Sequence, residues 1–171
     1  MNRYPVYEEI QLESHVFPGI ARRRMTKFTG SLCAEVVRKY LAESGIHVSS
    51  RNVFVAGVPI EIDLIIPHPS SQPKYGLIYE PEDVVGILEI KFSGAYSQDV
   101  APHLKEQFAR IRSICPGARC AYLTVCENLR YKGRVTTDRL GFQAFTLYWV
   151  NGKGQVERLG DPWESVVRFF K

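Results

Sequence analysis

The stretch VVGILEIKF, residues 84–92, decides the fold. Its nearly continuous run of apolar residues is typical of a central β-strand that is covered on both faces. Glu89 and Lys91 interrupt the end of this run. Because side chains alternate along a strand, these two lie on one face, about 7 Å apart. Charges at the end of so apolar a strand are costly unless they are paired or bound to a metal, which favours a functional site over a solvated surface pair.

A hairpin upstream supplies a further carboxylate. Residues 51–56 and 58–66 are rich in β-branched residues and are separated by Gly57, which predicts two strands joined by a tight turn. In the second strand one face is taken by Ile60, Ile62, Leu64 and Ile66, which places Glu61 and Asp63 on the other. We expect Asp63 to join the site and Glu61 to meet solvent.

The chemistry follows from the distance between these strands. If they are neighbours, a spacing of about 5 Å brings Asp63 and Glu89 within range of one hard cation. Two carboxylates leave several positions of an octahedral Mg²⁺ ion for water and phosphate oxygens, as metal-assisted hydrolysis of a phosphodiester requires. The ammonium of Lys91 would then orient or deprotonate the attacking water, or stabilise the charge that grows on the phosphate.

The other elements are predicted from hydrophobic periodicity and capping residues. They are an amphipathic helix over 31–44, a long loop over 67–81, a helix over 99–114 capped by Asp99, strands over 118–126 and 142–150, and a terminal helix capped by Asp161. The order of helix, three strands, helix, two strands and helix describes an α/β fold in which helices flank a mixed sheet.

Length and composition fit one domain. A chain of 171 residues with 45% hydrophobic and 23% charged residues buries a core without disulfides. Within it we expect an N-terminal arm or short helix over 1–29, a catalytic core over 31–126, and an additional strand and C-terminal helix over 140–171. The net charge of +4 permits a polyanionic partner without requiring one.

Several other classes of protein are disfavoured. The four cysteines and four histidines do not have the spacing of a zinc site. Residues 1–20 contain glutamates where a signal peptide would need an apolar run, and no stretch has membrane-spanning length, so we expect a cytoplasmic location and no membrane partner. No phosphate-binding loop or nucleophile elbow occurs at a strand-to-helix junction, which argues against a transferase.

The two strands quoted above resemble a known family. PIEIDLII (59–66), a spacer and VVGILEIKFSG (84–94), following a helix, are similar to the PD-(D/E)xK nuclease superfamily, and the resemblance spans residues 31–126. It implies a restriction endonuclease-like αβββαβ core. It also implies an endonuclease that hydrolyses phosphodiester bonds in DNA, with Mg²⁺ as cofactor and Mn²⁺ as its substitute.

The resemblance carries roles over to individual residues. Asp63 matches the acidic residue of the second strand, while Glu89 and Lys91 match the E-x-K of the third. The backbone carbonyl of Ile90 would complete the metal shell. Ile62 stands where the name of the motif has proline, a position at which proline is often missing.

Two helical residues are further candidates for the catalytic site. Many members of the superfamily add a glutamate from the first helix, and Glu35 is the best positional match, although it falls opposite the apolar stripe. Gln107 lies on the flank of the stripe of the second helix, where similar nucleases often place a glutamine or a lysine. Lys105 is the second choice for that position.

The substrate is the least determined part of the prediction. The SGAYSQ stretch after Lys91 and a basic loop would contact the sugar–phosphate backbone. The basic residues of that loop are Arg130, Lys132, Arg134 and Arg139. No recognition module is appended, so we expect a nuclease that relies on DNA shape, on a partner or on a homodimer. The competing hypothesis is a catalytically inactive nucleic-acid-binding or interaction module on the same fold.

Overall fold

The computed structural model describes residues 22–92, 100–134, 140–157 and 159–171. Its strands form two sheets. The smaller sheet has the order β2-β1-β4, with β1 Val53–Val55, β2 Val58–Ile62 and β4 Ile78–Tyr79. The larger sheet has the order β3-β5-β6-β7-β8, with β3 Leu64–Pro67, β5 Val84–Lys91, β6 Arg119–Asn128, β7 Gln143–Val150 and β8 Val156–Glu157. The helices of the described residues are α2 Arg22–Glu43, α3 Val100–Ile114 and α5 Pro162–Phe170, with short 3₁₀ helices η1 Pro81–Asp83 and η2 Leu129–Arg134.

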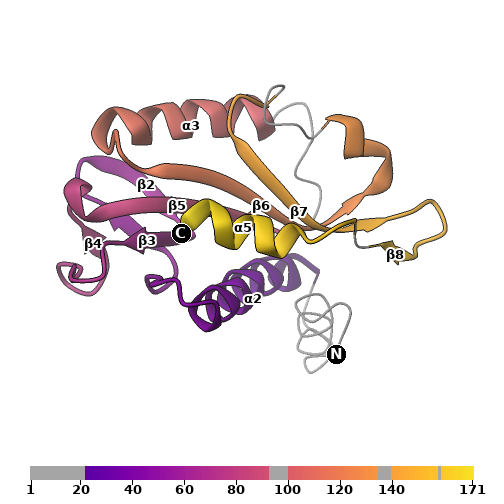
Figure 1. Ribbon diagram of the computed structural model, residues 1–171, viewed down its shortest axis with the longest axis horizontal. Helices are drawn as coiled ribbons and strands as arrows, with labels where there is room; N and C mark the ends of the chain where they lie inside the picture. The colour runs from indigo at the N-terminus through magenta and orange to yellow at the C-terminus, as the bar shows by residue number, and fades with distance from the viewer. Residues whose placement is uncertain (1–21, 93–99, 135–139, 158) are drawn as a thin grey trace.

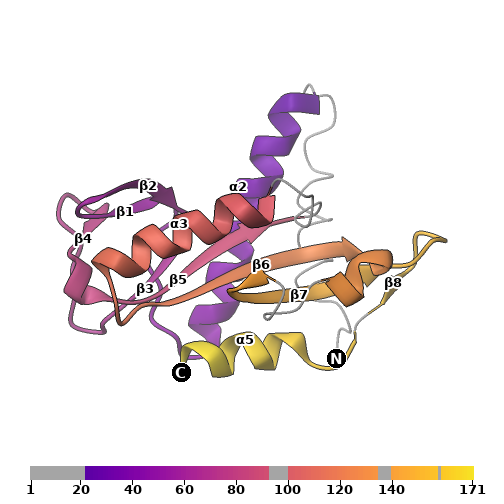
Figure 2. The same cartoon turned by 90° about the horizontal axis from the view of Figure 1, so that it is seen from above.

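The larger sheet is mixed and lies between helices. Strands β5, β6 and β7 are parallel, whereas β3 and β8 run antiparallel to their neighbours. Helix α3 covers one face of this sheet, and α2 and α5 cover the other (Figure 1). Seen from above, α2 crosses the strands while α5 runs alongside β7 (Figure 2). The predicted α/β fold with a mixed sheet flanked by helices is therefore confirmed.

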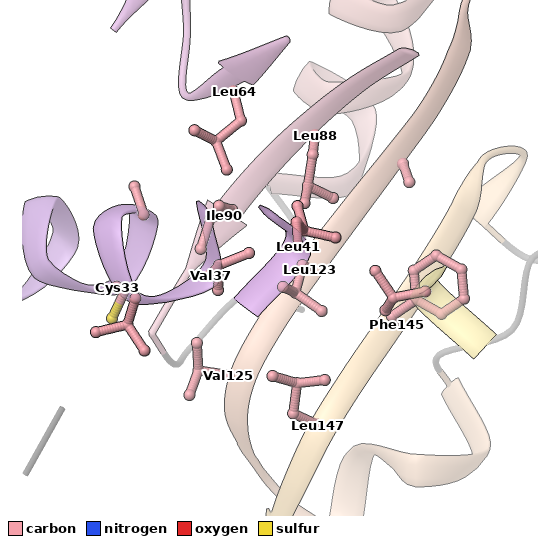
Figure 3. Packing of buried hydrophobic residues seen from close by; sticks show 14 of the residues in the cluster. Cys33, Val37, Leu41, Leu64, Leu88, Ile90, Leu123, Val125, Phe145 and Leu147 are labelled. Atoms are coloured by element: carbon pink, nitrogen blue, oxygen red, sulfur yellow. The ribbon is translucent and has the colours of Figure 1, made fainter. Parts of the chain in front are cut away.

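Strand β5 is apolar on both faces because each face enters a core. Leu88 packs with Val37 and Leu41 of α2 (Figure 3). Ile87, on the opposite face, packs with Phe108 of α3. All five side chains are buried, and burial of each stabilises the fold by about 1.5–3 kcal/mol. This two-sided burial is what the sequence of residues 84–92 predicts.

Helix α5 docks where β5 has no side chain. A Cβ atom at position 86 would lie only 2.8 Å from two ring carbons of Phe170, so glycine permits a close approach of helix and strand. The helix begins as predicted, because Asp161 Oδ1 accepts a hydrogen bond from the backbone N–H of Glu164 at 3.0 Å. Proline occupies the first turn.

Several predicted boundaries differ from the structure. Helix α2 begins at Arg22, so the last part of the stretch 1–29, predicted as an arm or short helix, belongs to the first core helix. The loop over 67–81 contains β4 and η1, and the short strand β8 was not predicted. The predicted cap Asp99 lies outside the described residues.

The largest difference concerns the strand predicted over 58–66. In the structure it is two strands, β2 and β3, which belong to different sheets. The hairpin predicted around Gly57 is confirmed, because β1 and β2 pair antiparallel on either side of it. No helix in the described parts of the chain is long and apolar enough to cross a membrane.

Candidate active site

Asp63 is the single residue between the two sheets. Ile62 pairs with β1 in the smaller sheet, and Leu64 pairs with Leu88 of β5 in the larger one. Pairing with β5 begins only at Leu64, so Ile90, two residues beyond Leu88, has no partner on β3. The carboxylate of Asp63 fills this gap, since its Oδ2 accepts a hydrogen bond from the backbone N–H of Ile90 at 2.8 Å. A side-chain oxygen thus replaces the acceptor that a longer β3 would have supplied.

The smaller sheet fixes the backbone of the same residue. The N–H of Asn52 donates to the carbonyl oxygen of Asp63 at 3.2 Å. The neighbouring Glu61 stays in β2 and is exposed, as expected. Asp63 is therefore fixed from both sides, by its carbonyl to the loop before β1 and by its carboxylate to β5.

Helix α3 positions the second carboxylate. Glu89 lies in β5 between Leu88 and Ile90, which both face α2, so its own side chain faces α3. There Gln107, which is buried, donates a hydrogen bond from Nε2 to Glu89 Oε1 at 3.1 Å. The sequence places Gln107 at the flank of the apolar stripe, and the structure brings it into direct contact with Glu89.

The pKa values of the Asp63 and Glu89 carboxyl groups depend on each other. Burial, and then the negative charge of Asp63, raise the pKa of Glu89 to about 8. Burial also raises the pKa of Asp63, against the hydrogen bond from Ile90. The pair therefore retains one proton near neutral pH, as neighbouring half-buried carboxyl groups do when no cation compensates their charge.

Lys91 lies at the exposed end of β5. It shares a face with Glu89, because Ile90 between them points into the core beneath α2. Its positive charge partly opposes the rise in the pKa of Asp63 and of Glu89 that burial causes. The structure therefore brings Asp63, Glu89, Lys91 and Gln107 together at the end of β5.

A hard divalent cation fits this set of donors. Two adjacent carboxylates that share a proton would exchange it for an ion with oxygen ligands. In a β-strand the N–H and C=O groups of one residue leave on the same side, so the carbonyl of Ile90 lies on the side of Asp63. Within the described residues no group of three or more His, Cys, Asp or Glu side chains is placed to hold a metal, so water and substrate would have to complete the shell.

The structure places Glu35 in a different set of contacts. Arg38 donates to its carboxylate through Nε, at 3.0 and 3.1 Å, and through Nη2. Arg51 lies on its other side, with Nε 3.4 Å from Oε2. The hydrogen bond from Arg38 lowers the pKa of Glu35. Among the described residues its polar partners are thus two arginines, and a catalytic role of Glu35 stays a prediction.

The structure also describes several other residues that were expected to contribute to the site or to contact the substrate. Lys105, the second choice to Gln107, lies against Gly141. Of the basic residues after β6, Arg130 and Lys132 are exposed in η2, and Arg139 lies outside the described residues together with the SGAYSQ stretch. The guanidinium of Arg130 stacks on the ring of Tyr131 at 4.6 Å.

Three residues near the site were missed by the sequence reasoning. Arg38, Arg51 and Asn52 line a cavity together with Glu35 and Ser50. Asn52 has a φ of 56°, a left-handed conformation that asparagine tolerates better than most residues. The Ser-Ser-Arg-Asn run at 49–52, rich in turn residues, is the sequence signal that could have pointed to a shaped loop.

Comparison with known proteins extends the fold assignment. No protein-family model and no curated protein matches the sequence. The architecture is nevertheless a restriction endonuclease-like α/β fold, and solved structures share it over almost the whole chain. These are structures of NucC. The cAAA-bound form from P. aeruginosa ATCC27853 has a TM-score of 0.62 at 11% identity, covering 96% of this chain and 87% of that one.

NucC from E. coli MS115-1 gives the same result. Its cAAA-bound form has a TM-score of 0.61 at 15% identity, with coverage of 97% of this chain and 88% of that chain. Its apo form has a TM-score of 0.55 at 16% identity, with coverage of 96% and 85%. Identities this low establish a shared fold, and the chemistry has to be argued from the residues at the end of β5.

Proposed function

We propose that this protein is a metal-dependent nuclease that hydrolyses phosphodiester bonds in DNA by Mg²⁺-assisted attack of water. One observation carries the proposal: the Asp63 carboxylate closes the end of β5 through the Ile90 N–H, beside Glu89 and on the same strand end as Lys91. The likeness to NucC supports a nuclease fold, and the PD-(D/E)xK pattern of the sequence supports the chemistry.

The carboxylates of Asp63 and Glu89 and the carbonyl of Ile90 would hold the ion. When bound, Mg²⁺ would lower the pKa of a coordinated water and neutralise charge on the phosphate. Gln107, through its Nε2–Oε1 hydrogen bond, would orient Glu89 as a ligand of the ion. Lys91, at the exposed end of the same strand face, would orient the attacking water or stabilise the negative charge that develops on the phosphate oxygens in the transition state.

The test is cleavage of supercoiled plasmid, linear duplex, branched DNA and RNA with Mg²⁺, Mn²⁺ or EDTA. Each reaction is run with and without cAAA, because two of the NucC structures are cAAA-bound forms. We expect metal-dependent cleavage that Asp63→Asn and Lys91→Ala each reduce by at least about a thousandfold. Matched controls are Glu61→Gln, an exposed carboxylate two residues from Asp63, and Lys153→Ala in the exposed β7–β8 turn.

Two results would count against this proposal. Cleavage that survives both active-site substitutions would assign the activity to another site or to a contaminant. A folded protein that binds Mn²⁺ and nucleic acid but cuts none of the substrates would favour the inactive nucleic-acid-binding module. The homodimer considered from the sequence stays a prediction, which light scattering of the purified protein tests.

A further inference from the structure

A polar cavity lies next to Asp63, at the loop before β1. Its volume is about 470 Å³, and its lining residues are Glu35, Arg38, Ser50, Arg51 and Asn52. Cavities of this size are in the range that holds small ligands or parts of larger ones. Two of the five lining residues are arginines, and both are about one third exposed (35%), so solvent reaches their guanidinium groups.

Glu35 holds the two guanidinium groups in place. It accepts hydrogen bonds from Nε and Nη2 of Arg38, and Nε of Arg51 lies 3.4 Å from it. Arg51 is fixed a second time, because its Nη1 donates to the carbonyl oxygen of Ser31 in α2 at 2.7 Å. Ordering of long side chains has an entropic cost, and here that cost is met before any ligand arrives.

These contacts leave part of each guanidinium available. A guanidinium carries five N–H donors, and Glu35 and Ser31 engage only some of them. The Nη1 end of Arg38 and the Nη2 end of Arg51 have no partner among the described residues. Pairs of such donors match the oxygens of a phosphate.

The charge of the cavity points to the same kind of ligand. Arg38 and Arg51 carry one positive charge each and Glu35 one negative charge, so the excess is positive. The hydrogen bond from Arg38 lowers the pKa of Glu35, which keeps that carboxylate ionised and committed to the arginines. The hydroxyl of Ser50 and the amide of Asn52 add further donors. A cavity dominated by donors with a positive excess selects an anion.

The cavity is joined directly to the proposed catalytic centre. Asn52, which lines it, donates its N–H to the carbonyl oxygen of Asp63 at 3.2 Å. One residue thus separates the cavity from the carboxylate that would bind the metal. An extended polyanion that places one phosphate at Asp63 and Glu89 would carry its next phosphates past this opening.

We propose that the Arg38–Arg51 cavity is a phosphate-binding subsite that holds the nucleic-acid backbone beside the phosphodiester to be cleaved. This inference rests on the proposed nuclease function for its choice of polyanion. It also gives Glu35 the role of a positioning residue for two arginines, in place of the catalytic role expected from the sequence.

Binding of fluorescein-labelled duplex and single-stranded DNA, followed by anisotropy with Ca²⁺ replacing Mg²⁺, tests the subsite. We expect Arg38→Ala and Arg51→Ala each to weaken binding about tenfold. The double variant should also flatten the dependence of log Kd on log salt by about one unit, because one phosphate contact is lost. Arg168→Ala is the matched control, since it removes an arginine from a helical ion pair with Glu164 outside the cavity.

Two additional variants separate binding from folding and from metal ligation. Arg51→Lys keeps the charge but not the forked donors, so binding should fall between that of wild type and Arg51→Ala while the melting temperature stays close to wild type. Glu35→Gln should leave Mn²⁺ affinity unchanged in calorimetry. Loss of Mn²⁺ binding in Glu35→Gln would overturn the positioning role and assign Glu35 to the metal site.

The outcomes distinguish this inference from the proposed function. Cleavage by wild type, with unchanged DNA affinity and salt dependence in the folded double variant, would overturn the subsite and leave the nuclease intact. Absence of cleavage by wild type, with DNA binding lost in the arginine variants, would support the subsite and overturn the nuclease. Displacement of DNA by poly-glutamate at equal charge concentration would overturn selectivity for phosphate.

Discussion

Each carboxylate at the end of β5 uses one oxygen for structure. Oδ2 of Asp63 takes the Ile90 N–H, and Oε1 of Glu89 takes the amide of Gln107. Such anchoring fixes the direction in which the other oxygen points, which is how metal ligands are usually held. In the protein without a metal ion this arrangement is costly, because two half-buried acids lie close together and one of them retains a proton.

The first residue-level prediction concerns the stability of the protein without divalent cations. The pKa of Glu89 is raised from 4.5 to about 8, so the folded state holds this proton more tightly than the unfolded chain does. The resulting stabilisation is complete below about pH 4.5 and is lost as the pH rises through about 8. In EDTA, wild type should therefore lose stability between about pH 5 and about pH 8 relative to Glu89→Gln, by on the order of 2 kcal/mol.

Urea unfolding of both proteins across this pH range measures the effect. Glu106→Gln, an exposed residue of α3, is the control and should follow wild type. A free-energy difference between wild type and Glu89→Gln that does not change with pH would mean that Glu89 titrates normally. Addition of Mg²⁺ at the alkaline end should stabilise wild type and not Glu89→Gln.

At the scale of elements, the site depends on the packing of α3 against β5. Gln107 lies one residue before Phe108, which is buried with Ile87 of β5, so the apolar contact sets the height of the amide above Glu89. The cross-strand neighbour of Lys91 on β6 is Thr124, a fully buried polar residue that has a partner of its own. Helix and sheet therefore define the polar strand end together.

The element-level prediction follows from that packing. Gln107→Ala removes the amide that orients Glu89 and leaves the helix in place. We expect metal affinity and cleavage to fall by about 10–100-fold, with part of the cleavage regained at high Mn²⁺, because an oriented ligand binds more tightly than a free one. Glu106→Ala on the exposed side of α3 is the matched control. Unchanged Mn²⁺ affinity in Gln107→Ala would show that the hydrogen bond from Gln107 is not needed to orient Glu89 for metal binding.

Most elements follow from local patterns, and the exceptions have a physical reason. The run 84–92 predicts a central strand that is covered on both faces, because burial of both faces favours apolar residues at nearly every position. The break at Asp63 leaves no such mark, since side chains alternate in the same way whichever sheet accepts the backbone hydrogen bonds. The period-2 rule therefore places Asp63 near Glu89 correctly, although it assigns both flanks to one strand.

The helical candidates show the same limit. Gln107 and Glu35 both lie outside the centre of an apolar stripe, so periodicity treats them alike. What separates them is distant in sequence: Glu89 lies opposite the first, and Arg51 lies opposite the second. Short elements such as β8, with two residues, carry too little pattern to be predicted.

The whole molecule is closed by α5, which packs on the face of the sheet shared with α2 (Figure 1). The contact of Phe170 with Gly86 joins the end of the chain to the middle of β5, the strand that bears the site. The Tyr40 and Trp163 rings, 6.0 Å apart, join α5 to α2. Stability of the site strand thus depends on the last helix.

The prediction at this scale is that Gly86→Ala destabilises the protein by about 1–3 kcal/mol. The added methyl group would overlap the ring of Phe170, which cannot move without disturbing the core. Gly117→Ala is the matched control, because nothing lies within 4 Å of a Cβ atom there. Adding Phe170→Leu to Gly86→Ala should return part of the loss in a double-mutant cycle. Strict additivity of the two substitutions would rule the overlap out.

The position of Asp63 between two sheets also links the hairpin of β1 and β2 to the candidate active site. The chain passes from β2 of the smaller sheet to β3 of the larger sheet through Asp63 alone. A displacement of β2 would therefore act directly on the backbone of Asp63, because no other residue lies between β2 and β3. A partner that binds β1 or β2 would therefore also shift the Asp63 carboxylate and its hydrogen bond to the Ile90 N–H at the end of β5.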